Sequence, residues 1–237
     1  MAYADWHHNT TYGFNYQPKK HIFIYLLQPL GCQKPAPRHH PHHCRRDIFS
    51  PRHAIFELIL MVSAKKTFNE IIFDTNICTF HIIIMGEQIA HLSFTMEDHL
   101  RARKIIELNR NNNIIRKKPS TNTPVCKELS EYLAGRRRHF DLTASPFFID
   151  RGTPLQQRIW RMIAAIPYGR TKTYGDIGRA LGNPSLARAV GQAAKANPVA
   201  LIIPCHRVTG AHDPGGFTGG TAIKKHLLQL EMENRLE

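Results

Sequence analysis

The sequence has few cysteines, and their positions do not suit a disulfide framework. There are 5 among 237 residues, an odd number, and they lie far apart in the chain. Small disulfide-stabilised domains of secreted proteins need an even number at regular, close spacing. The cysteine content therefore excludes such a scaffold and favours a reducing compartment. We expect a cytoplasmic protein, or a nuclear one if the source is eukaryotic.

Long apolar runs are also missing. The longest candidates, "IFIYLL" at 22–27 and "IFELILMV" at 55–62, are too short to span a bilayer. The N-terminus lacks the basic start and the small-residue cleavage site of a signal peptide. These absences predict a soluble chain with no membrane anchor.

Acidic residues are scarce relative to basic ones. The chain holds 18 Asp and Glu against 32 Lys and Arg, a formal net charge of +14. Residues 151–237 alone hold 12 basic and 5 acidic residues. An excess of this size favours a polyanionic partner, either a nucleic acid or an anionic membrane surface. Charge alone does not choose between the two.

Residues 1–66 have the composition of a poorly ordered extension. This segment holds 8 of the 15 histidines, and prolines recur along it. One cluster has the side chains of a transition-metal site, but no second cluster at a zinc-site spacing completes four ligands. We therefore predict no metal site. The cluster consists of His39, His40, His42, His43 and Cys44.

Residues 67–145 are predicted to form a small α/β domain. The stretch "EIIFDTNICTFHIIIMGEQIAHLSF" indicates strands interrupted at "DTN" and "GEQ". Helices are expected over 97–109 and 124–134, the second begun by Thr123 and ended by Gly135. Nothing in this domain suggests chemistry, and Cys78 and Cys126 are interpreted as small buried apolar residues.

Residues 146–237 are predicted to be mostly helical. Thr153 is a good N-cap with Gln156 three residues later, and apolar residues then recur at helical spacing up to residue 166. Thr173 with Asp176 begins a second helix, and Ser185 a third. Two helices joined by a short turn with glycine have the outline of a helix-turn-helix.

The third helix has two different faces. Leu186, Val190 and Ala193 form an apolar stripe that should be buried. The other stripe is small and cationic, which suits a helix that approaches phosphates closely, although a solvated surface would have the same pattern. Its members are Arg188, Gly191, Gln192 and Lys195.

A cysteine follows this helix between a proline and a histidine, in "LIIPCHRV" at 201–208. Together with the "NPSLARAVGQAAKANP" before it, the segment resembles the signature region of the O6-alkylguanine-DNA alkyltransferases, the methylated-DNA–protein-cysteine methyltransferases. The resemblance is close over 153–231 and loose over 68–145. It extends from "TYGDI" at 173–177 to "GGFTGG" and "KKHLLQLE".

The resemblance implies a fold and an activity. The fold is a two-domain α/β protein, with a small RNase H-like α/β domain over 67–145 and a helix-turn-helix domain over 146–237. The activity is DNA repair by direct reversal. Cys205 would take the alkyl group from O6-alkylguanine, and from O4-alkylthymine, in double-stranded DNA, once per molecule, as a monomer without a cofactor.

The resemblance also implies residue roles. A free thiol is mostly protonated at neutral pH, so Cys205 needs a base, and His206 is the obvious one. Neighbouring side chains in extended backbone point apart, so contact requires a bend after Pro204 or a bridging water. The family uses a Cys–water–His–Glu relay, in which Glu231 is the matching acid. Without the resemblance, Glu231 is an ordinary residue near a C-terminus.

Further roles concern the base and the DNA. Tyr174 would protonate the departing guanine, although its position would equally suit a half-buried aromatic residue at a helix start. Asn197 would fix the turn before the cysteine segment. Arg188 would fill the gap left by an extruded nucleotide. The remaining DNA contacts are Thr173, Gly191, Gln192 and Lys195; Val208, Phe217 and Thr218 would line the base pocket, with Phe217 where many relatives carry tyrosine.

Two other classes of protein compete with this interpretation. A helix-turn-helix regulator needs the DNA helix but has no use for "PCHRV", and the non-reactive alkyltransferase-like lesion binders lack the cysteine. A papain-like hydrolase needs its cysteine and histidine on separate elements and an oxyanion site. The adjacent Cys205 and His206 do not fit that requirement.

Overall fold

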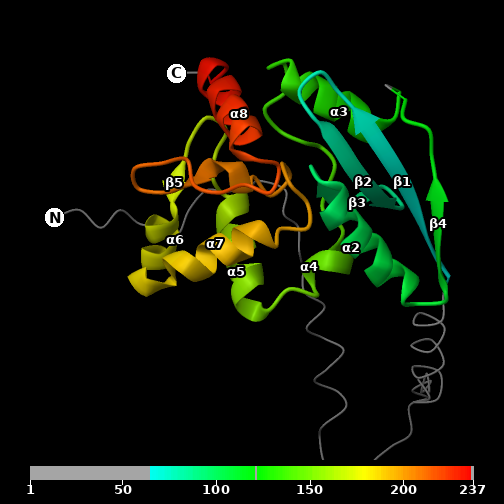
Figure 1. Ribbon diagram of the computed structural model, residues 1–237, viewed down its shortest axis with the longest axis horizontal. Coiled ribbons are helices and arrows are strands. Elements are labelled where there is room, and N and C mark those ends of the chain that lie inside the picture. Colours follow the sequence, from blue (N-terminus) through cyan, green and yellow to red (C-terminus); the bar gives the residue numbers. More distant parts are fainter. Residues whose placement is uncertain (1–64, 121, 236–237) are drawn as a thin grey trace, which may run out of the picture. The chain divides into compact units, whose positions relative to one another are not determined.

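The computed structural model describes residues 65–120 and 122–235 (Figure 1). These residues belong to one compact unit. Of the predicted extension, only residues 65 and 66 belong to the described ranges. The histidine-rich cluster at 39–44 and Cys32 lie outside those ranges. None of the helices in the described ranges is long and apolar enough to cross a membrane.

A four-stranded sheet begins the described chain. Its strands are β1 (Lys66–Asp74), β2 (Thr79–Met85), β3 (Gln88–Ser93) and β4 (Asn112–Arg116), in the order β3-β2-β1-β4. Neighbours are antiparallel except β4, which runs parallel to β1. The first three strands and their breaks confirm the prediction. The short "NNIIR" of β4 went unpredicted because asparagine is rare in strands.

Helices cover both faces of this sheet. On one face α2 (Met96–Glu107) and α4 (Pro146–Ile149) enclose a small apolar cluster. On the other face α3 (Pro124–Leu133) packs against the main core, which continues into the rest of the chain. The α2 cluster consists of Phe68, Ile83, Ala90, Ala102, Ile106 and Phe148.

The interface between α2 and the sheet also buries polar side chains. Glu70 Oε1 lies 2.7 Å from His99 Nε2 and 3.2 Å from Arg103 Nη1, so a guanidinium and an imidazole both bind this carboxylate. The His81 and His91 rings lie 5.4 Å and 6.1 Å from that of His99. Burial lowers the pKa of His91 to about 3, so its imidazole is neutral in the folded protein.

The second half of the described chain is mostly helical, with one pair of two-residue strands. β5 and β6 pair in parallel. The elements in order are α5 (Pro154–Ala164), β5 (Lys172–Thr173), α6 (Tyr174–Ala180), the 3₁₀ turn η1 (Pro184–Leu186), α7 (Ala187–Lys195), the 3₁₀ turn η2 (Cys205–Arg207), β6 (Val208–Thr209) and α8 (Thr221–Glu233).

The predicted starts of α5 and α6 are confirmed at the level of individual hydrogen bonds. Thr153 Oγ1 accepts from the Gln156 backbone, and the Gln156 side chain accepts from the Thr153 backbone. Thr173 and Asp176 form the same reciprocal pair at α6. Each capping box satisfies two of the backbone N–H groups that a helix N-terminus leaves free.

The predicted start of α7 is wrong by two residues. Ser185 lies in η1, whose first backbone groups are capped by Asn183, and the α-helix begins at Ala187. Leu186 consequently belongs to the turn and is only half-buried. The buried stripe of α7 consists instead of Val190, Ala193 and Ala194.

The sheet and the helical part are joined through the backbone of β3. Leu92 donates its N–H to Pro198 O at 3.0 Å and accepts from Ala200 N at 2.9 Å. Within the helical part, Trp160 Nε1 on α5 donates to Ala193 O on α7 at 2.8 Å. The segment that leads from α7 to the cysteine is therefore held by the edge of the sheet.

We predict that the protein loses stability as the pH is lowered, because His91 is buried in its neutral form. Since the pKa of His91 drops from 6.5 to about 3 on folding, the unfolded chain binds its proton first as the pH is lowered. The free energy of unfolding should fall between pH 6.5 and 5 by up to about 1.4 kcal/mol per pH unit for this group. Urea unfolding at several pH values measures the slope.

The matched control replaces an exposed histidine. His91→Gln should reduce the slope of unfolding free energy against pH, because up to one proton fewer is bound on unfolding. His226→Gln, on the exposed side of α8, should leave the slope unchanged. Equal slopes in the two variants would contradict the assignment to His91.

Candidate active site around Cys205

A bend in the backbone places the cysteine. Pro204 has φ −78° and ψ 67°, and Cys205 N donates to Ile203 O at 2.8 Å, which is an inverse γ-turn centred on the proline. The η2 turn follows at once. Leu201, three residues before the proline, has a φ of 67°, an unfavourable conformation for a branched side chain. The backbone therefore bends at Pro204 and turns again through η2, which is one of the two alternatives that the sequence left open.

The thiol itself is buried and hydrogen-bonded. Cys205 is 5% exposed, and burial raises the pKa of its thiol. Asn197 Nδ2 opposes this effect by donating to Sγ at 3.2 Å, and it also donates to Ile203 O at 2.7 Å. Asn197 thus connects the end of α7 to the cysteine turn. Cys205 rests as a neutral thiol that requires a base.

His206 and Glu231 form a buried pair next to this thiol. His206 Nε2 lies 2.8 Å from Glu231 Oε1, and both side chains are 1% exposed. Burial lowers the pKa of His206, and the nearby carboxylate only partly offsets it. Although burial alone would raise the pKa of Glu231, hydrogen bonds from His206 and Arg207 lower it to about 2. The pair is therefore a neutral imidazole and a carboxylate.

This charge state fixes the histidine tautomer. Because Glu231 is ionised and only accepts, His206 must carry its hydrogen on Nε2. Its Nδ1 then presents a lone pair, and no described residue donates to that atom. An imidazole with a free Nδ1 lone pair, in the residue next to a thiol, can accept the thiol proton directly or through a water.

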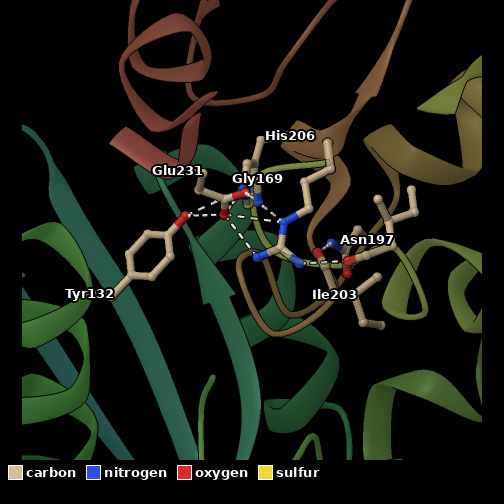
Figure 2. A network of polar contacts seen from close by, with 8 residues as sticks. Tyr132, Gly169, Asn197, Ile203, His206 and Glu231 are labelled. Atoms are coloured by element: carbon tan, nitrogen blue, oxygen red, sulfur yellow. Dashed lines mark hydrogen bonds and ion pairs between the residues drawn. The ribbon is translucent and has the colours of Figure 1, made fainter. Parts of the chain in front are cut away.

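Three further groups bind the Glu231 carboxylate, and sequence reasoning missed all of them (Figure 2). Arg207 donates from Nε and Nη2, at 2.9 Å to Oε2 and 2.8 Å to Oε1, and Gly169 N donates at 3.0 Å. Tyr132 Oη donates to Oε1 at 2.7 Å. Arg207 was visible as the next letter of the motif. Tyr132 lies on α3, within the segment 67–145 whose sequence suggested no chemistry.

Tyr174 stands at the first position of α6, close to the cysteine loop. Burial raises the pKa of its hydroxyl, with a further contribution from Cys205, so the group stays protonated and can donate. Gly215 packs on this ring with a φ of 72°, and a Cβ there would lie 2.6 Å from Tyr174 Oη. The glycine is required twice, by its backbone conformation and by this close approach.

A buried lysine was also missed. Lys224 on α8 is fully buried, and its Nζ donates to Val208 O at 2.6 Å and to Gly216 O at 3.2 Å. Burial lowers its pKa to about 8. It braces the loop that carries the predicted base-pocket residues, and it puts a positive charge near the Cys205 sulfur.

The predicted pocket residues lie on that same loop. Phe217 is half-buried; its ring centroid is 6.5 Å from that of His206 and 5.1 Å from that of Phe94 at the end of β3. Val208 is buried, and its carbonyl already accepts from Lys224. Thr218 is half-buried beside Phe217.

The residues predicted to meet DNA lie mostly on the outer side of α7. Arg188, Gln192 and Lys195 are exposed. Gly191 instead faces Tyr174, since a Cβ there would lie 3.8 Å from the tyrosine ring. The Thr173 oxygen accepts a hydrogen bond as the cap of α6. One short helix therefore has a cationic surface on one side and the tyrosine of the site on another.

The fold and the site define a protein in which a small sheet part supports a helical part that holds a buried thiol beside a histidine–carboxylate pair. Residues 154–233 match the model of the 6-O-methylguanine DNA methyltransferase DNA-binding domain. The methylated-DNA–protein-cysteine methyltransferase of Methanosarcina mazei is 35% identical over 158 residues, which is 65% of this chain and 92% of that protein.

Two other relatives indicate the same family. The enzyme of the same name from Methanosarcina acetivorans is 44% identical over 44% of this chain, and the match spans 65% of that protein. The crystal structure of Mycobacterium tuberculosis OGT in complex with DNA superposes with a TM-score of 0.57 at 31% identity, over 70% of this chain and 94% of that one. The chain belongs to the methylated-DNA–protein-cysteine methyltransferase family.

The buried ion pair at the centre of the site generates a stability prediction. Arg207→Met leaves Glu231 without its guanidinium partner in a buried place, which typically costs about 3–5 kcal/mol of unfolding free energy. Arg101→Met, which breaks the exposed pair with Glu97 on α2, should cost less than about 1 kcal/mol. Urea denaturation measures both. Similar losses in the two variants would contradict a structural role for the buried pair.

Proposed function

We propose that this chain repairs DNA by direct reversal, transferring the alkyl group of O6-alkylguanine, and of O4-alkylthymine, to Cys205. The observation that carries the proposal is the His206–Glu231 pair. Its tautomer leaves an Nδ1 lone pair available in the residue that follows the buried thiol. The relatives' names describe transfer from methylated DNA to a protein cysteine.

The proposed reaction is a displacement at the alkyl carbon. The Cys205 proton passes through a water to Nδ1 of His206, and the resulting imidazolium is stabilised at Nε2 by Glu231. The sulfur–carbon bond forms as the carbon–O6 bond breaks. Tyr174 donates its hydroxyl proton to the departing guanine, which would otherwise leave as an anion. The proton taken up by His206 then returns through solvent to the tyrosinate, so that one proton in all moves from the thiol to the base. The products are a thioether and an unmodified base.

The thioether ends the reaction. An S-alkylcysteine has no good leaving group, so each molecule acts once and needs no organic cofactor. Every group in the scheme comes from one chain, which supports a monomer. A nucleophilic thiol must be kept reduced, which supports the cytoplasm, or the nucleus in a eukaryote.

Finer features of the fold are part of the proposal. The order β3-β2-β1-β4, with β4 alone parallel to β1, supports an RNase H-like domain over 67–145. α6 and α7, joined by the turn at residues 181–186, support a helix-turn-helix within a domain over 146–237. Residues 1–66 would then be an extension to these two domains.

The proposed DNA contacts follow from α7. O6 lies near the pairing edge inside a duplex, so the nucleotide must rotate out before a buried sulfur can reach it. Arg188 would occupy the gap in the stack, because its guanidinium is long, planar and always charged. Lys195 would neutralise a phosphate, and Gln192 and Thr173 would contact the backbone. Gly191 would keep the helix narrow where Tyr174 approaches it.

The base pocket would be formed by the loop after the cysteine. Phe217 would stack on the extruded base, while backbone groups at Val208 and Thr218 would bind its edge. A phenylalanine keeps the stacking but offers no hydroxyl hydrogen bond, so the range of accepted alkyl groups depends on packing at this ring.

Intact mass measures the central reaction. Incubation with an oligonucleotide carrying O6-methylguanine should add a single methyl group to each chain, and peptide mapping should place it on Cys205. Cys205→Ala should accept none, because the only nucleophile of the scheme is gone. Turnover beyond one equivalent, or methylation of another cysteine, would disprove the proposal.

A second test separates extrusion from general DNA affinity. Arg188→Ala should slow repair in duplex DNA by at least about tenfold, because the cost of unstacking is no longer offset. Transfer from free O6-benzylguanine, where that base is accepted, should fall much less. Lys195→Ala should weaken binding to all duplexes and lower the salt dependence, with little effect at saturating DNA. Equal losses on duplex and free base in both variants would assign Arg188 to the fold.

A further inference from the structure

Tyr132 joins α3 to the histidine–carboxylate pair through its hydroxyl. It lies 74 residues before His206 and 99 before Glu231, on the helix that covers the sheet. Its side chain is fully buried, and the ring is packed by Phe140 and Tyr168, with centroids 5.3 Å and 6.2 Å away. The hydroxyl is therefore held rigidly.

The hydroxyl touches both members of the pair. Oη donates to Glu231 Oε1 at 2.7 Å and lies 3.3 Å from His206 Nε2, while His206 Nε2 is 2.8 Å from the same carboxylate oxygen. The three polar atoms form a triangle (Figure 2). Burial, together with the charge of Glu231, holds the pKa of Tyr132 well above 10, so the group is a permanent donor.

We propose that Tyr132 is a positioning residue of the alkyl transfer, which binds the same Glu231 oxygen as His206 and so limits how strongly that carboxylate holds a second proton on the imidazole. The predicted effect on the rate of alkyl transfer rests on the proposed function. The predicted effect on the protonation of His206 is independent of that function.

The direction of the effect follows from the two distances. The short bond to Oε1 neutralises part of the carboxylate charge that faces the imidazole, and it outweighs the longer contact to Nε2. Without the hydroxyl, more negative charge faces His206, which then holds a second proton more tightly. An imidazolium cannot accept the thiol proton, so transfer at low pH becomes slower.

The experiment compares two tyrosine variants. Tyr132→Phe removes the hydroxyl and keeps the ring. Tyr168→Phe is the matched control. The Tyr168 ring packs edge-on against that of Tyr132, and its hydroxyl is also buried but has no hydrogen-bond partner among the described residues. ¹⁵N-histidine NMR, with His206 assigned by a His206→Gln spectrum, follows the protonation of His206 with pH.

Tyr132→Phe should move the titration of His206 to higher pH, and Tyr168→Phe should leave it in place. The single-turnover rate on an O6-methylguanine oligonucleotide should fall about tenfold on the acid side of its pH profile and converge with the unmodified protein at alkaline pH. Affinity for the duplex should change less than about twofold, since the residue is far inside the site.

Each outcome decides one question. If His206 titrates identically in both variants and in the unmodified protein, Tyr132 only packs and the inference is wrong. If Tyr132→Phe shifts the titration of His206 but neither the variants nor the unmodified protein transfer an alkyl group, the proposed function is wrong. The effect of Tyr132 on His206 then still stands. If Tyr132→Phe does not fold, 3-fluorotyrosine at position 132 decides, because its stronger donor should move the titration to lower pH.

Discussion

The carboxylate of Glu231 is the constraint on which the site depends. A buried charge costs several kcal/mol unless its partners restore what water provided. Here the partners come from three separate places: Tyr132 on α3, the backbone of Gly169, and the adjacent His206 and Arg207 of η2. Movement of any one of these segments would take hydrogen bonds away from the buried charge. The ion therefore ties the sheet, the loop before β5, the cysteine turn and α8 into one arrangement.

In that arrangement the thiol and the imidazole of the site are both uncharged. Burial keeps Cys205 as a thiol, and the same burial keeps His206 neutral, with its proton directed at the carboxylate. Proton transfer from sulfur to nitrogen would create two opposite charges inside the protein, which the Asn197 amide, Lys224 and Glu231 each partly stabilise.

The α7 helix connects this chemistry to the outer surface. Its exposed side carries the cations, Gly191 lets the Tyr174 ring pack against it, and the helix ends just before Asn197, which binds the sulfur. The segment after Asn197 is held by β3 through Leu92. α7 thus contacts the tyrosine at its middle and leads into the cysteine turn at its C-terminal end.

Local signals were enough for much of this protein. The capping boxes at Thr153 and Thr173, the strand runs and the "PCHR" segment each depend on neighbours in the chain, so the sequence determined those elements and the nucleophile. The short β4 and the shift from Ser185 to Ala187 escaped because weak propensities were overridden by packing. Tyr132, Gly169 and Lys224 became part of the site only in the folded chain. Nothing within ten residues of Tyr132 marks it, and only tertiary structure brings its hydroxyl 2.7 Å from a carboxylate 99 residues away.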